Sequence, residues 1–326
     1  MLRDVILNSS DEFYLRLAAI SDMGLVDGEI RKTAWPILLK VDNVEWEIED
    51  ARNKNSEIIE MDVLRSISGN DIANRFSEDE RRTKRKELSK ILNTIIKTNP
   101  TLNYYQGFNH ICTVFLITSG LNIGYHLSEN CALNLLKDAM RNNFEQGLIQ
   151  QISLIYDLLD KKDPIVARKL ESIYAYNGEV EAPIICLSWV LCWFSNNLKS
   201  FKSISRIFDF CIATHALAPI YLSAIIFIWK KPKLLDCQNN YEFYELFKNL
   251  DDINCDKLCQ EAFELMIIFP PWELLAKHYN KFKSDSPVFE HSWLMKILSR
   301  KIRERKLGHF ITGFLLVTSV LVAIKL

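Results

Sequence analysis

Apolar residues recur along most of the chain at the three- and four-residue spacing of an amphipathic helix, and the alternation typical of strands is rare. A helix that Asp27 caps carries Ile30 and Ala34 on one face. Another begins at Ser77, where the hydroxyl and the carboxylate of Glu80 form a capping box. The pattern predicts an all-α fold, with helices near residues 11–21, 27–39, 77–98, 107–119, 128–140, 147–159, 163–173, 180–198, 201–213, 218–229, 241–248, 255–268 and 272–282.

The segment 307–324 differs from the rest because it holds no Lys, Arg, Asp or Glu. As a helix with a rise of ~1.5 Å per residue it would span about 27 Å, which matches a thin bilayer such as that of the endoplasmic reticulum. Basic residues crowd the preceding stretch, 300–306, and such residues mark the cytoplasmic flank of a membrane span. We therefore expect residues 307–326 to form a transmembrane tail anchor on a cytosolic domain. The alternative is a buried C-terminal helix, which would need protein around all its faces.

Two further uncharged stretches, 182–198 and 211–229, are also long enough to span a membrane. Pro219 interrupts the second, and the strongly polar residues 199–209 lie between the two. We therefore expect both to be central helices of a large core. A multi-pass membrane protein stays an alternative.

Composition narrows the possible functions. The chain has 326 residues, of which 48% are hydrophobic and 25% charged, as in chains that fold around a core. Its 40 basic and 41 acidic residues nearly cancel, which argues against a nucleic-acid-binding protein. The eight cysteines include no C-x-x-C pair, so we expect reduced structural thiols, and the charged N-terminus does not resemble a signal peptide.

The chain lacks the sequence patterns of a phosphate-binding glycine loop, a Ser-His-Asp arrangement or a zinc site. A helical domain of this kind is a candidate to act on a nucleotide bound by another protein. Two short segments, 58–66 and 99–109, then stand out.

These segments make the chain resemble the TBC family of Rab GTPase-activating proteins. The matching residues are Arg31 and Trp35 for R-x-x-x-W, Ile59, Asp62 and Arg65 for I-x-x-D-x-x-R, and Tyr104, Gln106 and Gly107 for Y-x-Q-G. Residues 206–209 resemble the C-terminal half of the family's domain, so the resemblance covers about residues 23–250. Ser66 stands where the family commonly has Thr, which removes no catalytic group.

The resemblance implies a multi-helix TBC domain at 23–250, after an N-terminal helix at 1–22. C-terminal helices and a basic linker would follow at 251–306, and a single transmembrane helix at 307–326.

The resemblance also implies an arginine finger at Arg65 and a glutamine finger at Gln106. An arginine offered in trans stabilises the charge that spreads over the transferred phosphoryl group, and accelerates GTP hydrolysis roughly 10³–10⁵-fold. Its guanidinium suits this role because it is always charged and binds phosphate oxygens as a planar fork. In the family the glutamine positions the attacking water.

The remaining motif residues would support these two. Asp62, Arg31 and Tyr104 are expected as supporting residues and Trp35 as a core residue, while Gly107 would allow the partner's backbone to approach closely.

The sequence thus predicts a GTPase-activating protein for a GTP-bound Rab, on the endoplasmic reticulum or early Golgi membrane. It would need no cofactor of its own, since GTP and Mg²⁺ belong to the GTPase. The alternative is a membrane-tethered adaptor that binds a Rab without turning it over.

Overall fold

The computed structural model describes residues 11–41, 51–68, 71–141 and 145–290. The expected anchor at 307–326 and the basic linker before it lie outside the described residues, as do residues 1–10 of the N-terminal segment.

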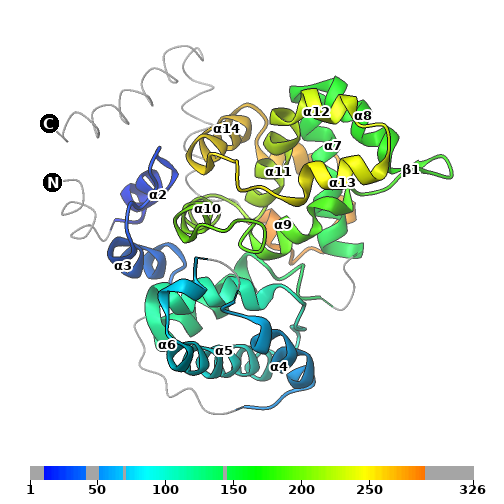
Figure 1. Cartoon of the computed structure of the whole chain (residues 1–326). Helices are drawn as coiled ribbons and strands as arrows, with labels where there is room; N and C mark the ends of the chain where they lie inside the picture. Colours follow the sequence, from blue (N-terminus) through cyan, green and yellow to red (C-terminus); the bar gives the residue numbers. More distant parts are fainter. Residues whose placement is uncertain (1–10, 42–50, 69–70, 142–144, 291–326) are drawn as a thin grey trace, which may run out of the picture.

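The described part of the chain is predominantly helical, as predicted (Figure 1). The helices are α2 (Glu12–Ile20), α3 (Gly28–Leu38), α4 (Ser56–Arg65), α5 (Glu78–Thr98), α6 (Phe108–Asn134), α7 (Gln150–Lys162), α8 (Pro164–Tyr174), α9 (Leu187–Cys192), α10 (Phe201–Ala213), α11 (Ala218–Trp229), α12 (Lys231–Asp236), α13 (Asn240–Lys248), α14 (Cys255–Ile268) and α15 (Pro271–Ala276). Shorter helical turns are the 3₁₀ segments Ala73–Arg75, Ile184–Cys186, Tyr279–Lys281 and Pro287–Phe289, and the π-helical segment Glu145–Ile149.

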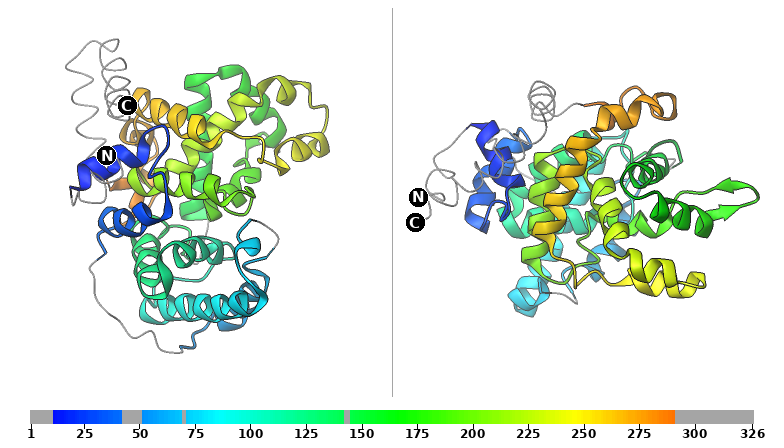
Figure 2. Two further views of the ribbon diagram at one scale, coloured as in Figure 1. Left: turned by 60° about the vertical axis from the view of Figure 1, so that its left-hand side comes forward. Right: turned by 90° about the horizontal axis from the view of Figure 1, so that it is seen from above.

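One small hairpin interrupts this helical pattern. Strands β1 (Ala175–Tyr176) and β2 (Glu179–Val180) pair antiparallel, with Ala175 opposite Val180. The hairpin projects from the helices in both Figure 1 and Figure 2. The helical pattern did not predict it, although the turn residues Asn177 and Gly178 both have positive φ, as expected of a tight Asn-Gly turn.

The helices form two groups joined by α10. Figure 1 shows α4, α5 and α6 together at one end, while α7, α8, α11, α12 and α13 lie at the other. Helices α2 and α14 both pack against α10, so the residues on either side of the expected 23–250 domain share its core. The rings of Trp35 on α3, Phe115 on α6 and Phe208 on α10 lie 5.5–6.1 Å apart, centroid to centroid, and join the two groups.

Several predicted helices differ from the structure. The segment 107–119 and the first half of 128–140 belong to one long element, α6, in which Gly120 has non-helical angles (φ 78°) and which ends at Asn134. The predicted helix 180–198 is wrong, because α9 ends at Cys192. Trp193 and Phe194 follow in left-handed conformation, and their buried rings pack against Phe208 and Trp189 respectively.

Within the described ranges, α6 is the one helix that is long and apolar enough to cross a membrane. It packs against α3, α5 and α9, and most of its apolar stretch is buried, so it is a core helix of the domain. The two uncharged runs weighed above also lie in the core, where they include α9 and α11.

Candidate functional site

The I-x-x-D-x-x-R and Y-x-Q-G segments meet at one buried carboxylate. Asp62 lies in the last turn of α4 and is only 3% exposed. The Tyr104 hydroxyl, in the loop before α6, donates a hydrogen bond of 2.6 Å to Asp62 Oδ2. Arg65 Nη2 binds the other oxygen, Oδ1. The shared carboxylate therefore fixes the end of α4 against the loop that carries Gln106.

The two expected finger residues both reach solvent. The Arg65 side chain is 67% exposed although it pairs with a buried carboxylate. Gln106 is exposed too, and its side chain has no hydrogen-bond partner in the part of the chain that the structure describes. Arg65 follows Asp62 by three residues and Gln106 follows Tyr104 by two, so each finger residue is close in sequence to one partner of the Asp62–Tyr104 hydrogen bond.

A second layer of polar contacts lies behind the fingers. Asn109 Nδ2 donates to Ser66 Oγ at 2.9 Å, and Asn109 Oδ1 accepts from the Gly107 amide at 3.2 Å. Ser66 Oγ donates to the Asp62 carbonyl oxygen, and Arg85 Nε on α5 donates to the Ser66 carbonyl oxygen at 3.0 Å. These roles of Asn109, Ser66 and Arg85 were not predicted from the sequence. Two of these residues could have been suspected from their positions, because Ser66 and Asn109 follow closely after the two finger motifs.

Backbone conformation around the fingers is tightly constrained. Ile67, two residues after Arg65, is buried with φ 57°, a conformation that β-branched residues rarely adopt. Gly107 has φ 126°, and a Cβ added there would lie 2.9 Å from Cys192 Sγ. Gly107 is also buried, and the close approach that its missing side chain permits within the domain is to Cys192.

Burial favours the neutral forms of three groups near Asp62, namely Tyr104, His110 and Cys192. Burial, and then the hydrogen bond to Asp62, raise the pKa of Tyr104 far above its usual value, so the phenol stays a donor. Burial lowers the pKa of His110, while the Asp62 charge acts in the opposite direction. Burial raises the pKa of the Cys192 thiol to about 12. The other seven cysteines are buried as well, as expected for structural thiols.

Arg31 and Trp35 lie in a different place, around Asp209 on α10. Arg31 Nη2 binds Asp209 Oδ2 at 2.8 Å, and Trp35 Nε1 donates to Asp209 Oδ1 at 2.9 Å. The Leu25 amide also donates to this fully buried carboxylate. The structure thus places Trp35 in the core, as predicted, and makes Arg31 a support of the fold with no contact to the finger segments.

No cluster of three or more His, Cys, Asp or Glu side chains that could hold a metal occurs among the described residues. The absence of a cofactor stays a prediction.

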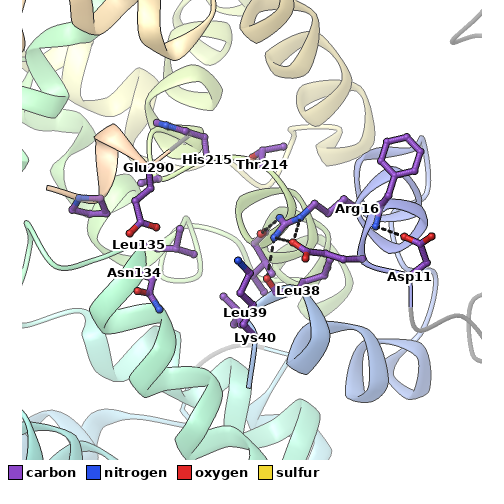
Figure 3. A pocket seen from close by; sticks show the side chains of 15 residues that line it. Asp11, Arg16, Leu38, Leu39, Lys40, Asn134, Leu135, Thr214, His215 and Glu290 are labelled. Carbon is purple, nitrogen blue, oxygen red and sulfur yellow. Dashed lines mark hydrogen bonds and ion pairs between the residues drawn. The ribbon is translucent and has the colours of Figure 1, made fainter. Parts of the chain in front are cut away.

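A cavity of about 730 Å³ lies elsewhere, between α2, α3, α6 and the turn after α10 (Figure 3). Arg16 lines this cavity, and its guanidinium donates hydrogen bonds to Glu12 and to the carbonyl oxygens of Leu38, Ile212 and Ala213. No residue of α4 or of the Gln106 loop lines it. The cavity is therefore separate from the finger site.

Comparison with known proteins identifies this arrangement. TBC1 domain family member 20 from Bos taurus and its Homo sapiens counterpart are each 31% identical over 281 residues, which is 82% of this chain and 66% of theirs. GTPase-activating protein gyp10 from Schizosaccharomyces pombe is 28% identical over 158 residues, which is 48% of this chain and 40% of that protein. The chain thus spans just under two thirds of the length of the two mammalian relatives.

Solved structures share the fold. The Ypt/Rab-GAP domain of Gyp1p superposes with a TM-score of 0.61 at 14% identity, over 82% of this chain and 97% of that one. The Chlamydomonas flagellar RabGAP TBC domain gives a TM-score of 0.51 at 15% identity, over 80% and 83%. The model of the Rab-GTPase-TBC domain matches residues 28–235, which contain all three motifs. The chain therefore belongs to the Rab-GTPase-TBC domain family.

Proposed function

We propose that the protein accelerates GTP hydrolysis on a Rab GTPase of the early secretory pathway by supplying Arg65 and Gln106 in trans. The observation that supports this most directly is the Asp62 carboxylate, which links the two segments and leaves both finger side chains exposed. Family membership supplies the partner class, and the names of the relatives speak of GTPase activation.

Each finger has a distinct task. Arg65 leaves its pairing with Asp62 in part to offer N–H donors to the oxygens of the γ-phosphoryl group as charge spreads over them. Gln106 holds the attacking water in line through its amide. A rate gain of roughly 10³–10⁵ corresponds to about 4–7 kcal/mol of barrier. GTP and Mg²⁺ belong to the Rab site, so this chain contributes side chains alone.

The decisive experiment is single-turnover GTP hydrolysis by a complete panel of purified Rabs with the full chain in mild detergent. Arg65→Ala and Gln106→Ala should each abolish the acceleration on the responsive Rab. Arg65→Lys keeps the charge but loses the fork, and should recover little. Arg168→Ala removes an exposed arginine on α8 and should leave the rate unchanged.

Tyr104→Phe probes the link between the segments in the same assay. It removes the hydroxyl that holds Asp62 and should lower the hydrolysis rate about tenfold while the domain stays folded. If Rabs bind in the GTP state but none is accelerated, the chain is a membrane-tethered Rab-binding adaptor instead.

We also propose that residues 307–326 anchor the protein in the endoplasmic reticulum or early Golgi membrane, with the TBC domain in the cytosol. Support comes from the sequence: the uncharged stretch 307–324 is about 27 Å long as a helix, and basic residues precede it.

A further inference from the structure

A small cavity of about 200 Å³ lies where the turn between α2 and α3 meets the first turns of α10 and α14. Three cationic side chains line it, those of Arg31, Lys202 and Arg206, together with the Asp256 carboxylate. We call it the Arg31 cavity. The described residues that line it include none from 58–66 or 99–109, so it is separate from the finger site.

Arg31 presents an unused edge of its guanidinium to this cavity. Its Nε and Nη2 both bind the Asp209 carboxylate, at 3.0 and 2.8 Å. These two nitrogens form one edge of the planar group, so Nη1 lies on the opposite edge. Although Arg31 is only 6% exposed, Nη1 has no hydrogen-bond partner in the part of the chain that the structure describes. The two N–H donors of Nη1 are therefore left for a ligand in the cavity.

The other two cations differ in how far they are already engaged. Arg206 donates from Nε to Asp256 at 2.9 Å, and from Nη1 and Nη2 to the carbonyl oxygens of Ala19 and Ser21. Lys202, in the first turn of α10, is exposed and forms no ion pair within the described ranges. Arg206 thus builds the wall of the cavity, and the Lys202 ammonium is available beside Arg31 Nη1.

Two helices begin at the cavity. Lys202 and Ser203 come from the first turn of α10, and Cys255 and Asp256 from the first turn of α14. The N-terminus of a helix carries roughly half a positive charge and favours anions. The cavity therefore favours an anion, and the half-used arginine supplies the donors that would position it.

Carboxylates near the cavity limit how much negative charge its ligand carries. Asp22 and Glu29 are exposed and flank in sequence the turn residues that line the cavity, and Asp256 lies in its wall. A polyanion would place further charges against these carboxylates. A single phosphate monoester, with a charge of about −1.5 to −2 at pH 7, keeps its charge inside the cavity.

The rim of the cavity is apolar. Met23 and Val26 line it from the α2–α3 turn and are 47% and 42% exposed. The turn itself is firmly held, because the Leu25 amide donates to Asp209 Oδ2 at 3.0 Å and a Cβ on Gly24 would lie 2.7 Å from that oxygen. Pockets that enclose a drug-sized ligand measure roughly 300–1,000 Å³, so this smaller cavity holds a charged headgroup while an apolar remainder lies against the rim.

We propose that the Arg31 cavity binds the phosphate monoester headgroup of an anionic lipid. Arg31 Nη1 and the Lys202 ammonium donate hydrogen bonds to the phosphate oxygens. Met23 and Val26 pack against the apolar chain that the phosphate carries. This lipid contact belongs to the folded domain itself, and it depends neither on the proposed GTPase activation nor on the proposed anchor.

The test measures binding to the full chain in a non-ionic detergent by isothermal titration calorimetry at constant salt. The probes are inorganic phosphate, dihexanoyl phosphatidate and dihexanoyl phosphatidylcholine. The phosphatidate should bind roughly tenfold more tightly than inorganic phosphate, because it adds the apolar contact to the same headgroup. The phosphatidylcholine carries a phosphodiester without net charge and should give only the heat of mixing with detergent.

A matched pair of variants places the binding in the cavity. Ser203→Asp adds a carboxylate there and should weaken phosphatidate binding at least tenfold, whereas Ser203→Asn has the same shape without the charge and should stay within about twofold of wild type. An acidic residue in the first turn of α10 is compatible with folding, which circular dichroism checks. Lys202→Gln should weaken binding about fivefold. Lys233→Gln, an exposed lysine on α12, should have no effect.

Val26→Asn separates a lipid from a free ion. Val26 has φ 57°, which Asn adopts more readily than Val, so the turn keeps its shape. The variant should lose most of the extra affinity for phosphatidate and bind inorganic phosphate as wild type does.

Two results would overturn the proposal. Equal wild-type affinities for phosphatidate and inorganic phosphate would assign the cavity to a free ion and exclude the lipid. Phosphatidate binding that Ser203→Asp leaves intact would place the lipid elsewhere on the protein. Rab-stimulated hydrolysis by the Ser203→Asp variant should equal that of wild type, so failure of the lipid site and failure of the proposed GTPase activation are told apart.

Discussion

Two buried carboxylates hold arginines in this molecule with opposite results. Asp209 takes Arg31 into the core, where the arginine side chain is only 7% exposed. Asp62 holds Arg65 by one nitrogen while most of that side chain stays in solvent. The difference lies in where the arginines sit, because Arg31 is on the buried face of α3 and Arg65 is the last residue of α4. The first pair supports the fold, and the second leaves an arginine ready for a partner.

The Asp209 pair gives a prediction for stability. Asp209→Asn keeps the shape but leaves the buried Arg31 charge without a counterion, so the free energy of unfolding should fall by about 3–5 kcal/mol. Urea denaturation followed by circular dichroism measures it. Adding Arg31→Met removes the stranded charge and should recover part of the loss. A loss below about 1 kcal/mol in the single variant would contradict this account.

At the scale of elements, features that depend on neighbouring residues were predicted correctly from the sequence, whereas features that depend on contacts between distant residues were not. The Ser77–Glu80 capping box forms as predicted, because all its partners lie within one turn. The end of α9 was missed because burial of the Trp193 and Phe194 rings, against residues far along the chain, decides it. The motifs pointed to Arg65 and Gln106. The Arg85–Ser66 and Asn109–Ser66 contacts depend on how α4, α5 and α6 pack, which spacing does not encode.

The first turn of α6 carries a pH-dependent element. Burial lowers the pKa of His110 in the folded protein below its unfolded value of about 6.5. Above about pH 6.5, His110 is mostly neutral in both the folded and the unfolded protein. Below it the unfolded chain binds the proton more readily, so stability falls as pH drops from about 6.5 through the folded pKa.

Urea midpoints between pH 7.5 and 5 test this, and the slope should flatten in His110→Gln. Asp285 does not interfere, because hydrogen bonds from Lys137 and Arg141 lower its pKa to about 2. Its contribution is lost only below about pH 4. An identical slope in wild type and His110→Gln would refute the assignment.

For the whole molecule, the proposed anchor should be separable from the proposed activity. All described finger contacts lie within residues 55–192, far along the chain from 307–326. Deleting residues 307–326 should therefore move the protein from the membrane to the soluble fraction and leave hydrolysis on a soluble Rab within about twofold of wild type. Cell fractionation and the single-turnover assay measure the two effects. Persistent membrane association of the shortened chain would rule out this anchor.

The bond between Arg31 and Asp209 also bears on how the chain folds during synthesis. The two residues are 178 positions apart, so α3 cannot bury its charged residue until α10 has left the ribosome. At roughly 5–20 residues per second, the wait is on the order of 10–40 s. Throughout it, the apolar face of α3 around Trp35 lacks the α10 surface that will cover it. The nascent N-terminal third should therefore be a chaperone substrate, and it should be released as residue 209 emerges.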